Sequence, residues 1–145
     1  MGVPSRDSWV LAGMTATGKS SLRPVHVQKL FFLLDERVAV GLGDRFFSFQ
    51  PYDYGPFDKA VYESLESLGD AGLVEITSTS SGLRSYELTA TGRARGTAEL
   101  SKLPAPTQDK IRSLAEWVAG QDFASLVSAV YKAYPAMRAN SVFVD

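Results

Sequence analysis

Residues 24–41 read PVHVQKLFFLLDERVAVG, and the architecture of the chain is organised around this stretch. Phe32 and Leu33 sit on a second apolar face of the expected helix, so we expect it to be buried on most sides. Pro24 suits a first helical turn, and glycines at 41 and 43 are typical of a helix end. The first apolar face follows the spacing i, i+3, i+4, i+7 and i+11: Val27, Leu30, Phe31, Leu34 and Val38.

The chain that follows predicts a strand, a turn, a second helix and a hairpin. Residues 46–50 (FFSFQ) alternate as a short strand does. Gly55 is expected to adopt a positive φ in the next turn, and Pro56 to occupy the first position of a helix over about 56–71. Two further strands, joined by a loop of threonine, serine and glycine, are expected to pair: 73–78 and 84–88.

Helical segments flank this central region on both sides. Residues 7–16 predict a short apolar helix capped by Asp7, with a strand as the alternative, and residues 17–24 have the composition of a loop. Thr89 is a suitable cap for the first of three C-terminal helices, which are expected over about 89–101, 107–119 and 122–134.

These elements predict a mostly helical α+β protein, with one domain over residues 1–145. Their order is that of a winged helix-turn-helix, in which 56–71 takes the position of the recognition helix and 73–88 forms a two-stranded wing. The expected core spans about 24–93, and residues from about 94 to 145 form an additional helical extension.

Composition narrows the classes of function. The 145 residues include no cysteine, which excludes a disulfide framework, a thiolate metal site and a cysteine nucleophile. No apolar run approaches the ~18 residues of a membrane span, so we expect a cytoplasmic protein with no membrane partner. The formal net charge of −1 gives the whole chain no strong attraction to nucleic acid.

Residues 13–20 (GMTATGKS) match the phosphate-loop pattern G-x-x-x-x-G-K-[ST], which would make Lys19 and Ser20 ligands of a nucleotide. A phosphate loop follows a buried strand and opens a long helix. Here Pro24 interrupts that helix, and the acidic residue of the second nucleotide motif, Asp35, falls inside a helical segment. We therefore interpret the match as a coincidence in a loop between two helices, and expect no cofactor or metal.

Other candidate residues point to macromolecular contact. His26 is the single histidine, and we interpret it as structural, so no catalytic residue is expected. Helix 56–71 carries four carboxylates against one lysine, an unfavourable balance for duplex DNA, whose binding depends on neutralised phosphates. The side chains that could contact a protein or nucleic acid are aromatic or basic: Tyr52, Tyr54, Lys59, Arg84, Arg93 and Arg95.

Several phrases resemble a known family. QKLFFLLD (28–35), FSFQPYDYGPFDKAVYESLESLGDAGLVEI (47–76), YELTATGR (86–93) and VYKAYPAMRANS (130–141) are similar to the YwgA-like family of uncharacterised prokaryotic winged-helix proteins. The QKL helix and the YGP turn also resemble, more loosely, the Panacea (SocA-like) antitoxin domain, whose members act through protein contacts. The resemblance implies a winged-helix core and a regulatory or defence-related role.

Three hypotheses follow from the sequence. The first is a non-enzymatic winged-helix binding module that contacts a protein or DNA, with a homodimer through 107–134 suggested by Trp117, which lies off the apolar stripe of its helix. The second is a sequence-specific DNA-binding transcriptional regulator that uses the wing with Arg93 and Arg95. The third is a nucleotide-binding protein that uses Lys19 and Ser20.

Overall fold

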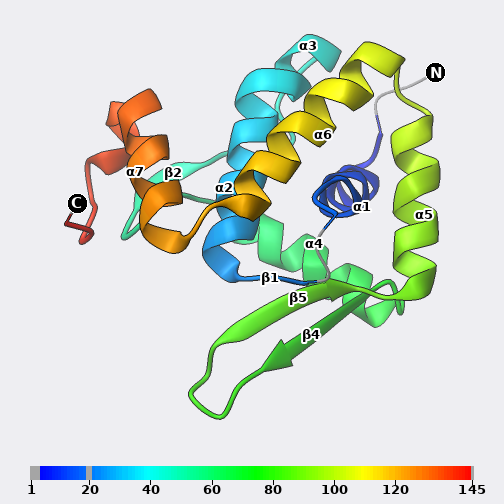
Figure 1. The fold of residues 1–145 in the computed structure, drawn as a ribbon, viewed down its shortest axis with the longest axis horizontal. Coiled ribbons are helices and arrows are strands. Elements are labelled where there is room, and N and C mark those ends of the chain that lie inside the picture. The colour runs from blue at the N-terminus through cyan, green and yellow to red at the C-terminus, as the bar shows by residue number, and fades with distance from the viewer. Residues whose placement is uncertain (1–3, 19–20, 145) are drawn as a thin grey trace.

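The buried helix expected from residues 24–41 lies at the centre of the computed structural model, which describes residues 4–18 and 21–144 (Figure 1). It comprises α2 (Pro24–Leu34), a π-helical turn η1 (Asp35–Ala39) and the short α3 (Val40–Leu42). Every α2 residue from Val27 onward is buried, which confirms a helix buried on most sides. The helix ends at Gly43, which has a φ of 141°.

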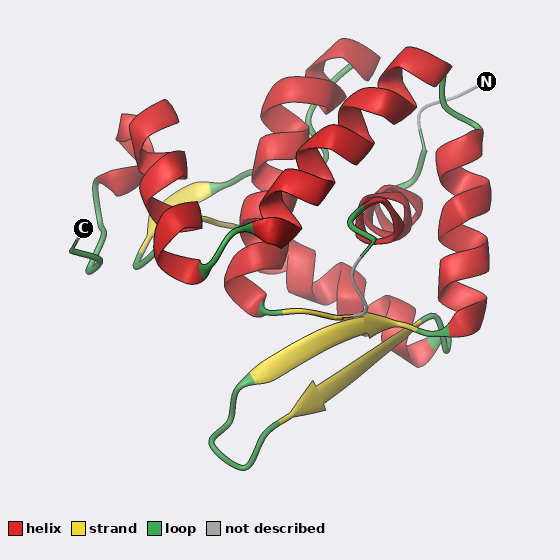
Figure 2. Ribbon diagram, viewed as in Figure 1, coloured by secondary structure: helices red, strands yellow, loops and turns green. Residues whose placement is uncertain are grey.

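Helix α1 (Arg6–Ala16) packs against α2, α4, α5 and α6. The expected helix over 7–16 is confirmed, but its cap is Ser5 and not Asp7. The hydroxyl of Ser5 accepts a 3.1 Å hydrogen bond from the amide of Ser8. Helix α1 is thus enclosed by other helices and forms part of the centre of the core together with α2 (Figure 2).

The predicted two-stranded hairpin is confirmed as β4 (Val74–Ser78) and β5 (Arg84–Leu88), which pair antiparallel. A third strand, β1 (Ser21–Leu22), pairs with β5, so the sheet order is β1-β5-β4. The prediction of a loop over 17–24 was wrong at these two residues, because the exposed backbone edge of β5 pairs with them.

A second, two-stranded sheet packs against α2 on one side and against the C-terminal helical segment on the other. It consists of β2 (Gln50–Tyr52) and β3 (Gly55–Phe57). Gly55 has a φ of 105°, which confirms the positive φ. The predicted strand over 46–50 was wrong: the strand starts only at Gln50, because the amides of the preceding phenylalanines donate to a side chain of the central helix.

Helix α4 (Lys59–Asp70) starts three residues later than predicted. Pro56 belongs to β3 and not to the first helical turn. Asp58 is the cap instead, since its carboxylate accepts a 2.9 Å hydrogen bond from the amide of Ala60.

The C-terminal helices are α5 (Ala90–Ser101), α6 (Ala105–Gly120) and α7 (Phe123–Ala133), followed by the 3-10 turn η2 (Pro135–Arg138). Thr89 caps α5 as expected. The tail returns to the β2–β3 hairpin, where the amide of Val142 donates to the carbonyl of Asp53 at 2.9 Å. The result is an α+β fold, mostly helical, with two small antiparallel sheets. No helix in the described part of the chain is long and apolar enough to cross a bilayer.

The close approach of α5 to its neighbours depends on two glycines. A Cβ on Gly92 would overlap the carbonyl group of Leu73, and a Cβ on Gly96 would lie 2.7 Å from the carbonyl oxygen of Leu11. Because glycine has no side chain, the backbone of α5 lies in close contact with the backbone of α1 and with that of Leu73, just before β4.

We expect Gly92→Ala and Gly96→Ala each to lower the free energy of unfolding by about 1–3 kcal/mol or more, because the added methyl group meets a backbone carbonyl at both positions and also the side chain of Thr15 at Gly96. The control is Gly120→Ala at the end of α6, where nothing lies within 4 Å of the added Cβ. Urea unfolding measures all three. Equal stability of Gly96→Ala and Gly120→Ala would contradict the close α1–α5 packing.

Candidate functional site

Lys29 is a buried lysine in the first half of α2, with 3% of its surface exposed. Its Nζ donates a long hydrogen bond, 3.4 Å, to the carbonyl oxygen of Pro56. The Cα of Gly55 lies against the same side chain, and a Cβ there would be 3.3 Å from Cε of Lys29. Burial lowers the pKa of Lys29 from 10.5 to about 7. The amine thus exchanges its proton near neutral pH.

Gln28 fixes the chain on the other side of β3. Its amide nitrogen donates to the carbonyl of Asp58, and its amide oxygen accepts from the backbone N–H of Asp58, both at 3.0 Å. The Asp58 carboxylate also accepts a 2.7 Å bond from the amide of Ser48. These contacts hold the β2–β3 hairpin and the start of α4 on α2.

A cavity of about 270 Å³ opens between α2 and this hairpin. Its rings contact one another: Tyr52 stacks on Phe57 at 5.0 Å between centroids, and Phe57 meets Tyr62 edge-on at 5.7 Å. Burial raises the pKa of Tyr62 to about 12, so its hydroxyl keeps its proton. The lining residues come from four elements, α2, β2, β3 and α4, and from the turn between β2 and β3: Pro24, Val25, Gln28, Lys29, Tyr52, Asp53, Tyr54, Gly55, Phe57 and Tyr62.

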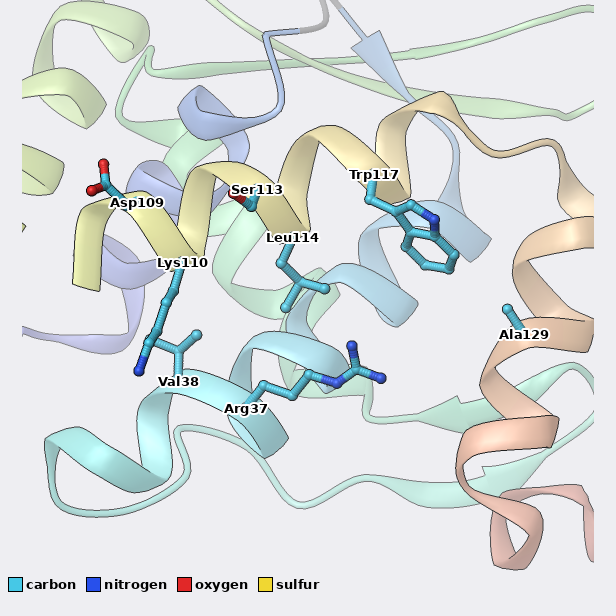
Figure 3. Close-up of a pocket in the computed structure, with 8 residues that line it drawn as sticks. All are labelled: Arg37, Val38, Asp109, Lys110, Ser113, Leu114, Trp117 and Ala129. Carbon is cyan, nitrogen blue, oxygen red and sulfur yellow. The ribbon is translucent and has the colours of Figure 1, made fainter. Parts of the chain in front are cut away.

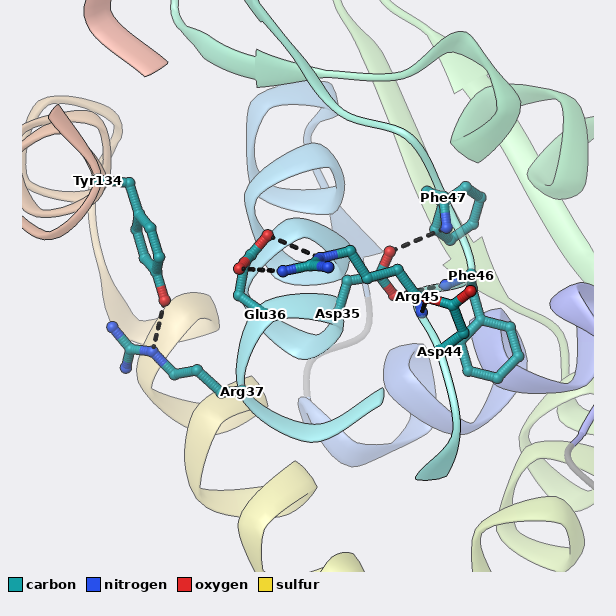
Figure 4. Close-up of polar contacts among 8 residues, drawn as sticks. All are labelled: Asp35, Glu36, Arg37, Asp44, Arg45, Phe46, Phe47 and Tyr134. Carbon is teal, nitrogen blue, oxygen red and sulfur yellow. Dashed lines mark hydrogen bonds and ion pairs between the residues drawn. The ribbon is translucent and has the colours of Figure 1, made fainter. Parts of the chain in front are cut away.

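Asp35 supports the hairpin from the far end of the central helix (Figure 4). Its fully buried carboxylate accepts hydrogen bonds from the amides of Phe47 at 2.9 Å and Phe46 at 3.2 Å. Burial raises the pKa of Asp35 to about 6, against the lowering effect of the two amides and of Arg45. The carboxylate that a nucleotide-binding interpretation would assign to magnesium therefore binds backbone amides of its own chain.

A larger groove, about 630 Å³, lies between α6, η1 and α7 (Figure 3). Trp117 lines it with 41% of its surface exposed, beside Leu114 of the same helix. Val38 and Arg37 contribute from η1, and Ala129 from α7. Arg37 is turned toward α7, where its Nε donates to the hydroxyl of Tyr134 at 3.2 Å. The groove also includes three polar residues of α6: Asp109, Lys110 and Ser113.

The structure brings only part of the predicted contact set together. Tyr52 and Tyr54 both line the Lys29 cavity, and they are 54% and 40% exposed. Lys59 is exposed at the start of α4, away from the cavity lining. Arg84, the first residue of β5, lies 4.0 Å from the carboxylate of Glu66 on α4.

Arg93 and Arg95 are both exposed on α5. Two residues apart on a helix, they point about 200° from one another, so they do not share a face. The predicted basic residues are therefore distributed over α4, β5 and two sides of α5.

The phosphate-loop match does not have the backbone that its chemistry requires. Gly13 lies inside α1, where a Cβ would be 2.6 Å from the ring of Phe31, and the helix continues to Ala16. The glycine that would cradle phosphate instead permits helix packing. Lys19 and Ser20 lie outside the described residues. His26 has a structural contact: its Nε2 is 2.6 Å from the carbonyl oxygen of Gln121.

Sequence reasoning missed Lys29, which it did not single out as a candidate. The available signal was its place in a helix that is apolar on both faces, where a lysine has no solvated side to occupy. Comparison with known proteins adds no assignment: no protein-family profile, curated protein or solved structure matches this chain.

We expect Lys29→Met to be more stable than the wild type near pH 6, with a difference that shrinks as the pH rises. The unfolded chain keeps the lysine proton up to about 10.5, whereas the folded protein keeps it only to about 7. Folding thus releases a proton between these values, and the free energy of unfolding of the wild type rises with pH across that window. Each displaced unit of pKa contributes about 1.4 kcal/mol.

Denaturant unfolding at a series of pH values measures this difference. Lys132→Met, which removes an exposed lysine of α7, is the matched control and should follow the wild type. A stability difference between Lys29→Met and the wild type that stays constant from pH 6 to pH 10 would show that burial does not lower the pKa of Lys29.

Asp35→Ala should lower the free energy of unfolding by about 1–3 kcal/mol, because the amides of Phe46 and Phe47 lose their acceptor. Glu36→Ala is the control: it removes a neighbouring carboxylate whose 3.0 Å ion pair with Arg45 is partly exposed, and such pairs contribute about 0–1 kcal/mol. Thermal unfolding compares the two. A larger loss in Glu36→Ala would contradict the assigned role of Asp35.

Proposed function

We propose that this protein is a non-enzymatic winged-helix module that binds a protein partner in the groove between α6, η1 and α7. The observation that supports it is the exposed Trp117, which stands with Leu114 over an apolar groove of about 630 Å³. Tryptophan in such a setting is the residue most often found at energetically dominant positions of protein interfaces. The regulatory or defence-related role rests on the family resemblance alone.

The order of elements favours the winged-helix interpretation. Helix α1, strand β1, helices α2 and α4, and the β4–β5 hairpin follow one another, with the insertion β2–β3 between the two helices. The short strand β1 pairs with the second strand of the hairpin, and this β1-β5-β4 order is the sheet that a winged helix builds beside its helices. The additional helices α6 and α7 then supply the groove.

Charge favours a protein partner over duplex DNA. The exposed side of α4, the helix in the recognition position, carries Glu63, Glu66 and Asp70. Arg84 of the wing is near Glu66, which reduces its availability to phosphate. DNA binding draws much of its affinity from phosphate neutralisation, and these surfaces oppose it.

The groove fits an amphipathic helix with an acidic side chain next to its apolar face. Its apolar surface comes from Val38, Leu114 and Trp117, which would take the apolar face. Lys110 lines the same groove and makes no ion pair with any residue of the described ranges, so it is free to meet a carboxylate. A second copy of this chain fits less well, because two concave grooves facing each other leave a gap.

The test is a titration with an identified partner. Protein retained from a lysate of the source organism is identified, expressed separately and titrated against the wild type and variants. Trp117→Ala and Leu114→Glu should each weaken its binding at least tenfold. Leu83→Ala, which removes an even more exposed apolar side chain at the tip of the β4–β5 hairpin, should leave the affinity unchanged.

Two other outcomes would overturn this proposal. Light scattering that finds a dimer in the wild type and a monomer in Trp117→Ala would assign the groove to a second copy. Retention of nucleic acid that falls steeply with salt, and that Arg93→Ala with Arg95→Ala abolishes, would favour the DNA-binding regulator instead.

A further inference from the structure

The ammonium group of Lys29 lacks the partners that a buried charge ordinarily has. Its one recorded hydrogen bond, to Pro56, is 3.4 Å long, and no carboxylate of residues 4–18 or 21–144 forms an ion pair with it. A lysine carries three donors, so two remain available. A buried charge is costly unless it is paired. A methionine of similar length at this position would avoid the cost of burying a charge, and an arginine would keep its proton there.

The cavity next to this amine is suited to a compact ligand with an aromatic ring. Tyr52, Tyr54, Phe57 and Tyr62 form much of its lining, and its volume of about 270 Å³ lies just below the range of drug-sized pockets. Pairs of these rings already stack on one another, which leaves faces and edges for a further ring.

The polar groups of the cavity are mainly donors. Gln28 is occupied on both sides of its amide by Asp58. The ammonium group of Lys29 remains to donate. The hydroxyl of Tyr62 is hydrogen-bonded to Gln28 through its oxygen and keeps its own proton to donate, so both groups favour an acceptor such as a carboxylate. Asp53 also lines the cavity, and its negative charge opposes any anion there, a singly charged carboxylate less than a phosphate ester with several charges.

We propose that the cavity between α2 and the β2–β3 hairpin binds a carboxylate attached to a small aromatic group, with the carboxylate paired to Lys29 and the ring among the tyrosines. This chemistry has two sources: a free aromatic acid, or the C-terminal aromatic residue of a polypeptide. The site lies on different residues from the α6–η1–α7 groove, so neither proposal depends on the other.

Calorimetric titration at pH 6, where the amine holds its proton, tests the carboxylate requirement. Phenylacetate should bind at least tenfold more tightly than phenylacetamide, which has the same ring and no charge. Lys29→Met should remove that preference, and Lys132→Met, at an exposed lysine of α7, should retain it. Circular dichroism establishes that each variant is folded.

A second variant keeps the amine and removes the space. Val25 lines the cavity and is half-buried, so Val25→Phe should fill it and reduce phenylacetate binding at least tenfold while Lys29 is still present. Loss of binding in both Lys29→Met and Val25→Phe supports the proposal. Equal affinity for phenylacetate and phenylacetamide, or no binding of either at millimolar concentration, overturns it.

The tripeptide Gly-Gly-Phe and its C-terminal amide distinguish the two sources. Tighter binding of the free tripeptide than of phenylacetate, lost on amidation, assigns the cavity to a polypeptide end. Weaker binding of the tripeptide than of phenylacetate assigns it to a free acid. Either result retains the pairing of a carboxylate with Lys29.

Discussion

Three polar side chains of one buried helix hold the segment from 46 to 58 in place. Gln28 binds both backbone groups of Asp58, Lys29 donates to Pro56, and Asp35 accepts from two amides that precede β2. A segment this irregular has few backbone partners of its own, so its amides and carbonyls depend on side chains. The position of the β2–β3 hairpin, and with it the cavity of aromatic rings, follows from these contacts.

These contacts come at a cost that apolar residues would not impose. Both Lys29 and Asp35 have pKa values displaced by burial, one downward and one upward, which means that each charge is disfavoured where it lies. Asp35 recovers part of that cost through its two amide bonds, whereas Lys29 recovers little through one long bond. The cost of burying Asp35 is therefore offset within the fold to a greater extent than the cost of burying Lys29.

Apolar periodicity was sufficient to predict α2, α4, α6 and α7, because each buries one face or more against the core. It was insufficient for β1, whose two residues become a strand only because β5, distant in the sequence, lies next to them.

The alternating residues 46–49 (FFSF) have the pattern of a strand, yet two of their backbone amides donate to Asp35. Lys29 was missed for a similar reason: charge predicts exposure unless the whole helix is enclosed. The position of Trp117 off the apolar stripe of its helix could be read from the sequence. The groove beside it could not, because η1, which lines the groove, is distant in the sequence.

Because of the π-helical turn η1, the side chains of the central helix point in different directions before and after the turn than they would in a continuous α-helix. In an uninterrupted α-helix, each residue advances by about 100°, so the wider turn shifts the faces that follow it relative to those before. Gln28 and Lys29, before this turn, contact the β2–β3 hairpin and the start of α4, whereas Arg37 and Val38 line the groove between α6 and α7. One helix thus lines two separate recesses, the aromatic cavity with residues before the π-helical turn and the α6–α7 groove with residues of the turn itself.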